Sequence, residues 1–170
     1  MDATLSLVIA LAIGIAQTFQ AAVLGAASRR RGGREASLMA QLATAAVLAV
    51  LIAAIALDEG QTKLLSPLDS GWLLYVLVPL FALLLWLTTR GLPWWFASGG
   101  LVSLTLVLSP RLIGDLGLAL FFAATTFGSC ASALAFDHLG AFGAARRALT
   151  AQRLGGLTLV GLGVVLVRVA

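Results

Sequence analysis

Six apolar stretches of 17 to 24 residues, separated by short polar segments, make up most of this 170-residue chain. They are Thr4–Ala27, Ala36–Leu57, Gly71–Thr89, Pro93–Ser109, Leu116–Phe136 and Ala151–Val169. A helix needs roughly 20 mostly apolar residues to cross the hydrocarbon core of a bilayer. Lipid offers the backbone no hydrogen bonds, so spanning segments of this length must be helical. The sequence therefore predicts an all-α integral membrane protein, a single transmembrane domain over residues 1–170 with about six helices.

The composition excludes the main alternatives to a membrane protein. Hydrophobic residues make up 61% of the chain and charged residues 11%, whereas soluble domains are about half apolar and a quarter charged. A chain this small could not hide so much apolar surface from water. Cys130 is the one cysteine, which excludes a disulfide scaffold.

The 11 basic residues lie near the ends of the apolar stretches or in the segments between them. One cluster, from Arg29 to Arg34, follows the first stretch, and a second, Arg146, Arg147 and Arg153, lies around the start of the last. Neither cluster is interleaved with aromatic residues, so no nucleic-acid partner is expected. Basic residues after an apolar stretch hold that end in the cytoplasm, which indicates an outside N-terminus and no cleavable signal peptide.

The positive charge also bears on the number of crossings. With six crossings, eight basic residues lie inside: Arg29, Arg30, Arg31, Arg34, Arg90, Arg146, Arg147 and Arg153. Lys63, Arg111 and Arg168 then lie outside. If Gly71–Thr89 did not cross, every later loop would change sides and the split would fall to six against five. Six crossings agree with the positive-inside rule, and five remain the alternative.

A few polar side chains lie deep in the stretches. Gln17 and Gln20 share one face of the first predicted helix, and Gln41 and Thr44 share one face of the second at a similar depth. A carboxamide in hydrocarbon is costly unless it is hydrogen-bonded. Together with Ser129 these residues either bond helices to one another or line a midplane site for a neutral or weakly polar molecule. Thr125, Thr126 and Ser132 belong to the same polar face as Ser129.

No Asp, Glu, Lys or Arg lies deep in any stretch, which predicts a site without a buried proton-coupling carboxylate. His138 is the one histidine and Cys130 the one cysteine, so neither a metal site nor a cofactor is expected. No nucleophile, base and acid are arranged for catalysis. We predict that the protein is not an enzyme and has no catalytic residues.

Several motifs occur together in a recognisable order. They are GIAQTFQAAVLGAASRRRGG from Gly14, PWWFASGG from Pro93, PRL from Pro110 and GSCASALAFDHLG from Gly128, followed by a Gly-rich last helix. In these stretches the chain resembles the YdcZ-like family of the drug/metabolite transporter (DMT, EamA-like) superfamily, whose members are small exporters of the bacterial inner membrane. Members of this family carry a Gln in the first helix, and that position is Gln20 here. Two other family positions differ: the Asn that follows is Leu24 in this chain, and the Gln of the next-to-last helix is Ser129.

The resemblance implies a DMT-like, multi-pass, alternating-access exporter. Because a short bundle cannot enclose a pathway alone, it also implies a homodimer or a heterodimer with a related small chain. The expected substrate is a small neutral or amphiphilic, even lipid-like, molecule bound by Gln17, Gln20, Gln41, Thr44 and Ser129, and membrane lipids are the other expected partners. The family pattern has no counterpart of Gly71–Thr89. An extra crossing there puts both arginine clusters on the same side of the membrane, as expected for a subunit that inserts in one fixed orientation. The alternative is a non-transporting scaffold for a partner membrane protein, in which the Gln pairs only join helices.

Overall fold

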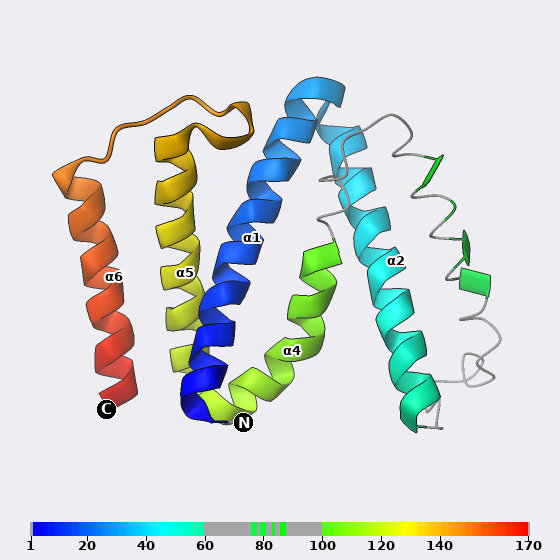
Figure 1. The fold of residues 1–170 in the computed structure, drawn as a ribbon, viewed down its shortest axis with the longest axis horizontal. Coiled ribbons are helices and arrows are strands. Elements are labelled where there is room, and N and C mark those ends of the chain that lie inside the picture. Colours follow the sequence, from blue (N-terminus) through cyan, green and yellow to red (C-terminus); the bar gives the residue numbers. More distant parts are fainter. Residues whose placement is uncertain are drawn as a thin grey trace. The chain divides into compact units, whose positions relative to one another are not determined.

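The computed structural model describes residues 2–59, 76–77, 79–80, 83, 86–87 and 100–169 (Figure 1). These residues contain helices and turns and no strand. The helices are α1 (Ala3–Arg31), α2 (Gly33–Glu59), α4 (Gly100–Leu116), α5 (Leu118–Leu139), the 3₁₀ turn η3 (Ala141–Gly143) and α6 (Ala151–Val169). The all-α prediction is confirmed.

Four helices in the described part of the chain are long and apolar enough to cross a membrane. They lie at Ala3–Arg31, Gly33–Ile52, Leu118–Leu139 and Ala151–Val169. The predicted stretch Gly71–Thr89 lies largely outside the described residues, although Val76, Leu77, Pro79, Leu80, Leu83, Trp86 and Leu87 are each helical. The membrane class of the fold is confirmed, and the number of crossings stays a prediction.

One prediction about helix boundaries is wrong. The sequence predicted one helix over Pro93–Ser109 and the next from Leu116. In the structure α4 continues through Pro110 to Leu116, and the break comes at Gly117, whose φ of +77° suits glycine. A proline inside a membrane helix removes only one backbone hydrogen bond, and neighbouring groups compensate for it.

The described chain forms two compact units, Met1–Ala26 with Thr105–Ala170, and Ala27–Leu104. In the first unit, α1 packs against α4 and α5 around a small core of Ala10, Ile13, Leu112, Phe121 and Ala124. Two glycines allow the closest approach. A Cβ on Gly14 would collide with the backbone oxygen of Thr125, and one on Gly128 with that of Leu11. The two helices therefore touch backbone to backbone, as small residues permit in membranes.

Contacts along this interface show that α1 and α5 run parallel. Near the start of α1, the buried Ser6 hydroxyl donates to Asp115 Oδ2, 2.9 Å away, just before α5 begins. Farther along, Thr18 Oγ1 donates to the Ser129 carbonyl at 3.1 Å. Between α1 and α5 themselves, Leu11 lies against Gly128, and the ring of Phe19 lies 6.4 Å from that of Phe136. Higher residue numbers in α1 thus meet higher numbers in α5, and the two helices run in the same direction (Figure 1).

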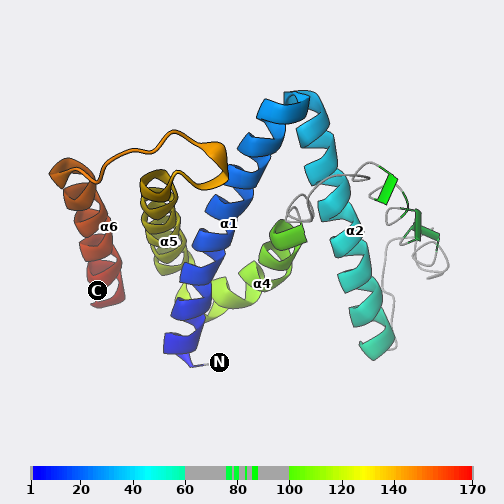
Figure 2. The ribbon, with the colours of Figure 1, turned by 45° about the horizontal axis from the view of Figure 1, so that its top comes forward.

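The end of α5 is tied to the loop that follows it. Gly140 has left-handed φ/ψ and caps α5 through its N–H to the Phe136 carbonyl. Phe142, at φ +58°, places its ring 5.3 Å from Phe19 and 5.9 Å from Phe136 in edge-to-face contact. The loop then leads into α6, which lies beside α5 in both views (Figure 1, Figure 2).

In the second unit, α2 meets the first turns of α4. Ser103, fully buried, donates its hydroxyl to the Thr44 carbonyl at 2.7 Å. Gly100 lies against Val47, whose Cγ2 would be 2.5 Å from an added Cβ. A small residue and a satisfied hydroxyl thus set the distance between these two helices.

Candidate functional site

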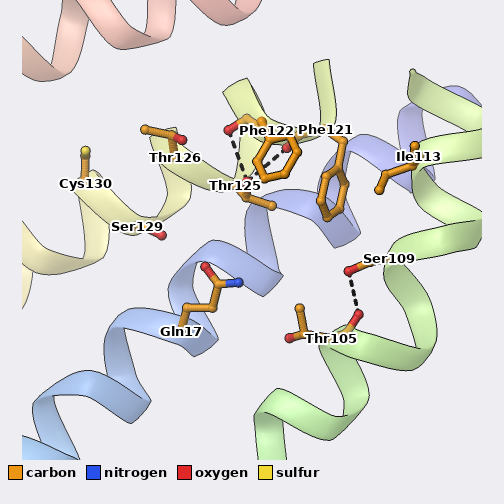
Figure 3. A pocket seen from close by; sticks show the side chains of 10 residues that line it. All are labelled: Gln17, Thr105, Ser109, Ile113, Phe121, Phe122, Thr125, Thr126, Ser129 and Cys130. Carbon is orange, nitrogen blue, oxygen red and sulfur yellow. Dashed lines mark hydrogen bonds between the residues drawn. The ribbon is translucent and has the colours of Figure 1, made fainter. Parts of the chain in front are cut away.

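A cavity of about 390 Å³ lies within the first unit, between α1, α4 and α5 (Figure 3). Its polar wall comes from all three helices: Gln17, Thr105, Ser109, Thr125, Thr126 and Ser129. Its apolar wall is formed by Ile113, Phe121, Phe122 and Cys130. Among the described residues that line it, none is a carboxylate, lysine, arginine or histidine. A cavity of this kind accommodates an uncharged molecule with one polar and one apolar side.

Helical spacing explains why these residues meet at one place. On α5, Phe122, Thr125, Thr126 and Ser129 recur three and four residues apart and share a face. On α4, Thr105 and Ser109 are four apart. The cavity therefore lies where a polar stripe on each of two helices meets the exposed side of α1.

Most hydroxyls of the wall already donate to backbone carbonyls. Ser109 Oγ donates to the Thr105 carbonyl at 2.6 Å, and Thr125 Oγ1 to the Phe121 carbonyl at 3.0 Å. Ser129 Oγ donates across the interface to the Gly14 carbonyl at 3.0 Å. Hydroxyl oxygens used in this way retain a free lone pair, so the wall offers mainly hydrogen-bond acceptors.

Gln17 differs from the other polar residues of the wall. Its side chain is exposed and projects toward the cavity (Figure 3). Among the described residues its carboxamide has no hydrogen-bond partner, so both its N–H₂ donor and its carbonyl acceptor remain available. Opposite it, the rings of Phe121 and Phe122 meet edge to face at 5.5 Å. The cavity thus combines one amide with an aromatic wall.

The predicted site residues fall into two groups. Gln17 and Ser129 line this cavity together, whereas Gln20, on the same helix, is partly buried and does not line it. Gln41 and Thr44 belong to the second unit. There Gln41 Nε2 donates to Ser37 Oγ at 3.4 Å, and Thr44 Oγ1 donates to the Ala40 carbonyl at 2.8 Å. A shared role of all five in one site stays a prediction.

Sequence reasoning missed Thr105, Ser109 and the two phenylalanines of the wall. The signal for the first two was present, because two hydroxyl residues four apart in an apolar stretch mark one helix face. Phe121 and Phe122 carried no such signal, since aromatic residues are common throughout membrane helices. In the described part of the chain, no three His, Cys, Asp or Glu residues are grouped to hold a metal ion.

The comparison with protein families agrees with this architecture. A family model described as "Putative inner membrane exporter, YdcZ" matches residues 5–166, nearly the whole chain. Searches of the curated proteins and of the solved structures found no match. The resemblance noted in the sequence is confirmed, and it identifies a transporter class rather than an enzyme class. The chain therefore belongs to the YdcZ family of inner membrane exporters.

Proposed function

We propose that the protein exports a small, uncharged amphiphilic molecule by alternating access, and that the cavity between α1, α4 and α5 is its substrate site. The observation that carries the proposal is the carboxamide of Gln17, which has no hydrogen-bond partner among the described residues. It faces an aromatic wall in a cavity whose described lining carries no charged group. An amide would hydrogen-bond the polar part of the substrate, and the phenylalanine rings would pack against its apolar part. Gln20, Gln41 and Thr44 are further proposed contacts on the pathway.

The absence of charge from the wall predicts a selectivity that can be measured. A charged ligand would lose its hydration in this cavity without gaining a countercharge, and that cost is large. N-acetylphenylalaninamide and N-acetylphenylalanine have nearly the same shape, and only the second is anionic at neutral pH. In proteoliposomes, we expect uptake of the labelled amide and at least about tenfold slower uptake of the acid. Equal rates would refute the proposed selectivity.

Substitution of Gln17 tests the role of its amide. Gln17→Leu keeps the size of the side chain and removes both hydrogen-bonding groups, so we expect amide uptake to fall about tenfold or more. Gln152→Leu, on the exposed face of α6, is the matched control and should leave uptake unchanged. Assembly is followed for both variants by gel filtration. A transport loss with normal assembly supports the exporter.

A second candidate function is a scaffold that holds a partner membrane protein. It is favoured by the polar bonds that join α1 to α5, from Thr18 to the Ser129 carbonyl and from Ser129 to the Gly14 carbonyl. In a scaffold Gln17→Leu would impair only assembly, and no uptake would be measured for any variant.

We also propose that the working unit is a homodimer or a heterodimer with a related chain. Support comes from α6, none of whose residues is buried in the described structure. Leu159, Leu162 and Leu166 are 70%, 59% and 68% exposed. A stable monomer that transports when expressed alone would exclude this proposal.

A further inference from the structure

A second cavity, of about 410 Å³, lies between α5 and α6. Its wall is apolar along most of its length, formed by Cys130, Ala133, Leu134, Gly156, Leu157 and Val160. Asp137 and Arg153 also line it and are joined by an ion pair of 3.2 Å. The exporter site described above uses none of these residues except Cys130, which lines both cavities.

The arrangement along the two helices gives the groove a polar end and an apolar end. Asp137 lies seven residues from Cys130 on α5, and Arg153 lies seven residues from Val160 on α6. At 1.5 Å per residue, the groove extends about 10 Å from the ion pair into the apolar part of the helices. A Cβ added to Gly156 would meet no atom within 4 Å, so the described structure leaves this groove open.

The polar end carries an excess of positive charge. Arg146 donates from Nε to the His138 carbonyl at 3.2 Å, and the Arg147 backbone N–H donates to the Asp137 carbonyl at 2.9 Å. These bonds hold the loop against the end of α5, next to Arg153. In the part of the chain that the structure describes, the exposed Arg147 guanidinium has no hydrogen-bond or ion-pair partner. Against three arginines stands the single carboxylate of Asp137, a net charge of +2.

We infer that this groove binds an anionic phospholipid, with its phosphate among Arg146, Arg147 and Arg153 and one acyl chain along the apolar wall. Charge complementarity selects the phosphate, because a basic pocket at the end of membrane helices attracts anionic headgroups. The apolar length of the groove favours a lipid over a free anion, since six of its eight lining residues have uncharged side chains that cannot pair with a phosphate. This site shares only Cys130 with the proposed substrate cavity and does not depend on the exporter function.

The test is lipid binding to the delipidated full-length protein by native mass spectrometry. Phosphatidylglycerol and phosphatidylcholine with identical acyl chains are titrated separately, and phosphatidylglycerol is expected to bind at least about fivefold tighter. Arg153→Gln and Arg147→Gln should each weaken phosphatidylglycerol about fivefold and leave phosphatidylcholine unchanged. Arg168→Gln, near the opposite end of α6, is the matched charge control and should change neither.

A second pair of variants tests the apolar part of the groove. Gly156→Leu fills it and should abolish binding of both lipids at this site. Gly155→Leu makes the same change on the adjacent residue, which also has open space around its Cβ but does not line the groove. It should bind both lipids normally. Because both variants replace glycine by leucine on α6, a folding effect would appear in both.

Cys130 provides an independent readout, because it is the one cysteine of the chain. Phosphatidylglycerol should slow its alkylation by N-ethylmaleimide in the unsubstituted protein and fail to do so in Gly156→Leu. Equal binding of the two lipids, equal behaviour of Gly156→Leu and Gly155→Leu, or protection by inorganic phosphate alone would each overturn the inference. Dimer formation that blocks the groove in place of lipid would overturn it as well.

Discussion

Gly14 and Gly128 determine how closely α1 can approach α5. At each position an added Cβ would meet backbone atoms of the opposite helix, which cannot rotate away as a side chain can. The same close approach brings Ser129 Oγ within 3.0 Å of the Gly14 carbonyl, so glycine packing and the hydrogen bond stabilise one geometry. In lipid, where helices gain little from hydrophobic burial against one another, such contacts supply much of the association energy.

Gly14→Ala tests this contact. The Ala Cβ would displace the Thr125 carbonyl and lie 2.8 Å from the Ser129 nitrogen, so the helices must separate. Overpacking of this kind costs about 1–3 kcal/mol, and we expect a clearly lower melting temperature in detergent. Gly155→Ala, which meets nothing within 4 Å, should melt at the same temperature or higher because alanine favours helix. Equal destabilisation of the two variants would contradict the packing argument.

The role of a polar residue depends on partners that are far away in the sequence. The polar face of α5 could be predicted from its spacing, and Ser129 lies on it beside Thr125 and Thr126. Its partner, however, is a backbone carbonyl 115 residues earlier, and no local pattern marks a carbonyl as a hydrogen-bond acceptor. Gln17 and Gln20 looked equivalent for the same reason. Only packing against α4 and α5 leaves Gln17 in the cavity wall and Gln20 outside it.

Among the described helices, α6 is the least integrated. It packs beside α5, where Gly161 brings it near the ring of Phe127, 3.0 Å from the position of an added Cβ. Its other faces contribute no buried residue. The apolar length of this helix could be predicted from the sequence, but its packing could not, because its glycines are equally compatible with a helix neighbour, a lipid or a second chain.

Cross-linking tests whether a second chain contacts α6. In a Cys130→Ala background, Leu162→Cys places one thiol on the exposed face of α6, where Leu162 is 59% exposed. If two copies pair through this face, oxidation in native membranes should give a covalent dimer in good yield. Leu118→Cys, equally exposed at 59% but on α5, is the control and should give little dimer. If both sites cross-link equally, α6 is not a specific interface, and a heterodimer would require the related chain to be co-expressed.

The parallel course of α1 and α5 bears on the path of the whole chain through the membrane. Parallel helices of one chain are separated by an odd number of crossings. The six-crossing prediction places three crossings between them, at Ala36–Leu57, Gly71–Thr89 and Pro93–Ser109, whereas the five-crossing alternative places two. The six-crossing prediction is therefore the one compatible with a parallel course of α1 and α5, and the distribution of positive charge favours the same number.

Thiol accessibility in intact cells tests this topology. With Cys130→Ala as the background, single cysteines are introduced by Glu35→Cys, Ala144→Cys and Asp2→Cys, all at exposed positions. With six crossings and an outside N-terminus, an impermeant maleimide should label only the Asp2→Cys variant, and permeabilised cells should label all three. Labelling of Ala144→Cys in intact cells, with Glu35→Cys protected, would instead indicate five crossings.

The sequence alone was sufficient to predict that this protein lies in a membrane, that it is helical and which family it belongs to. A long apolar stretch is stable in the hydrocarbon of a bilayer, and there its backbone must be helical to satisfy its own hydrogen bonds. Both conclusions follow from the local composition of each stretch of about 20 residues. The break at Gly117, the passage of α4 through Pro110 and the assignment of Gln17 to a cavity were decided only in three dimensions. Gln17 reaches its cavity only beside residues about 100 positions away, such as Thr125, and Ser6 likewise donates to Asp115. Such contacts exist only once the helices have packed.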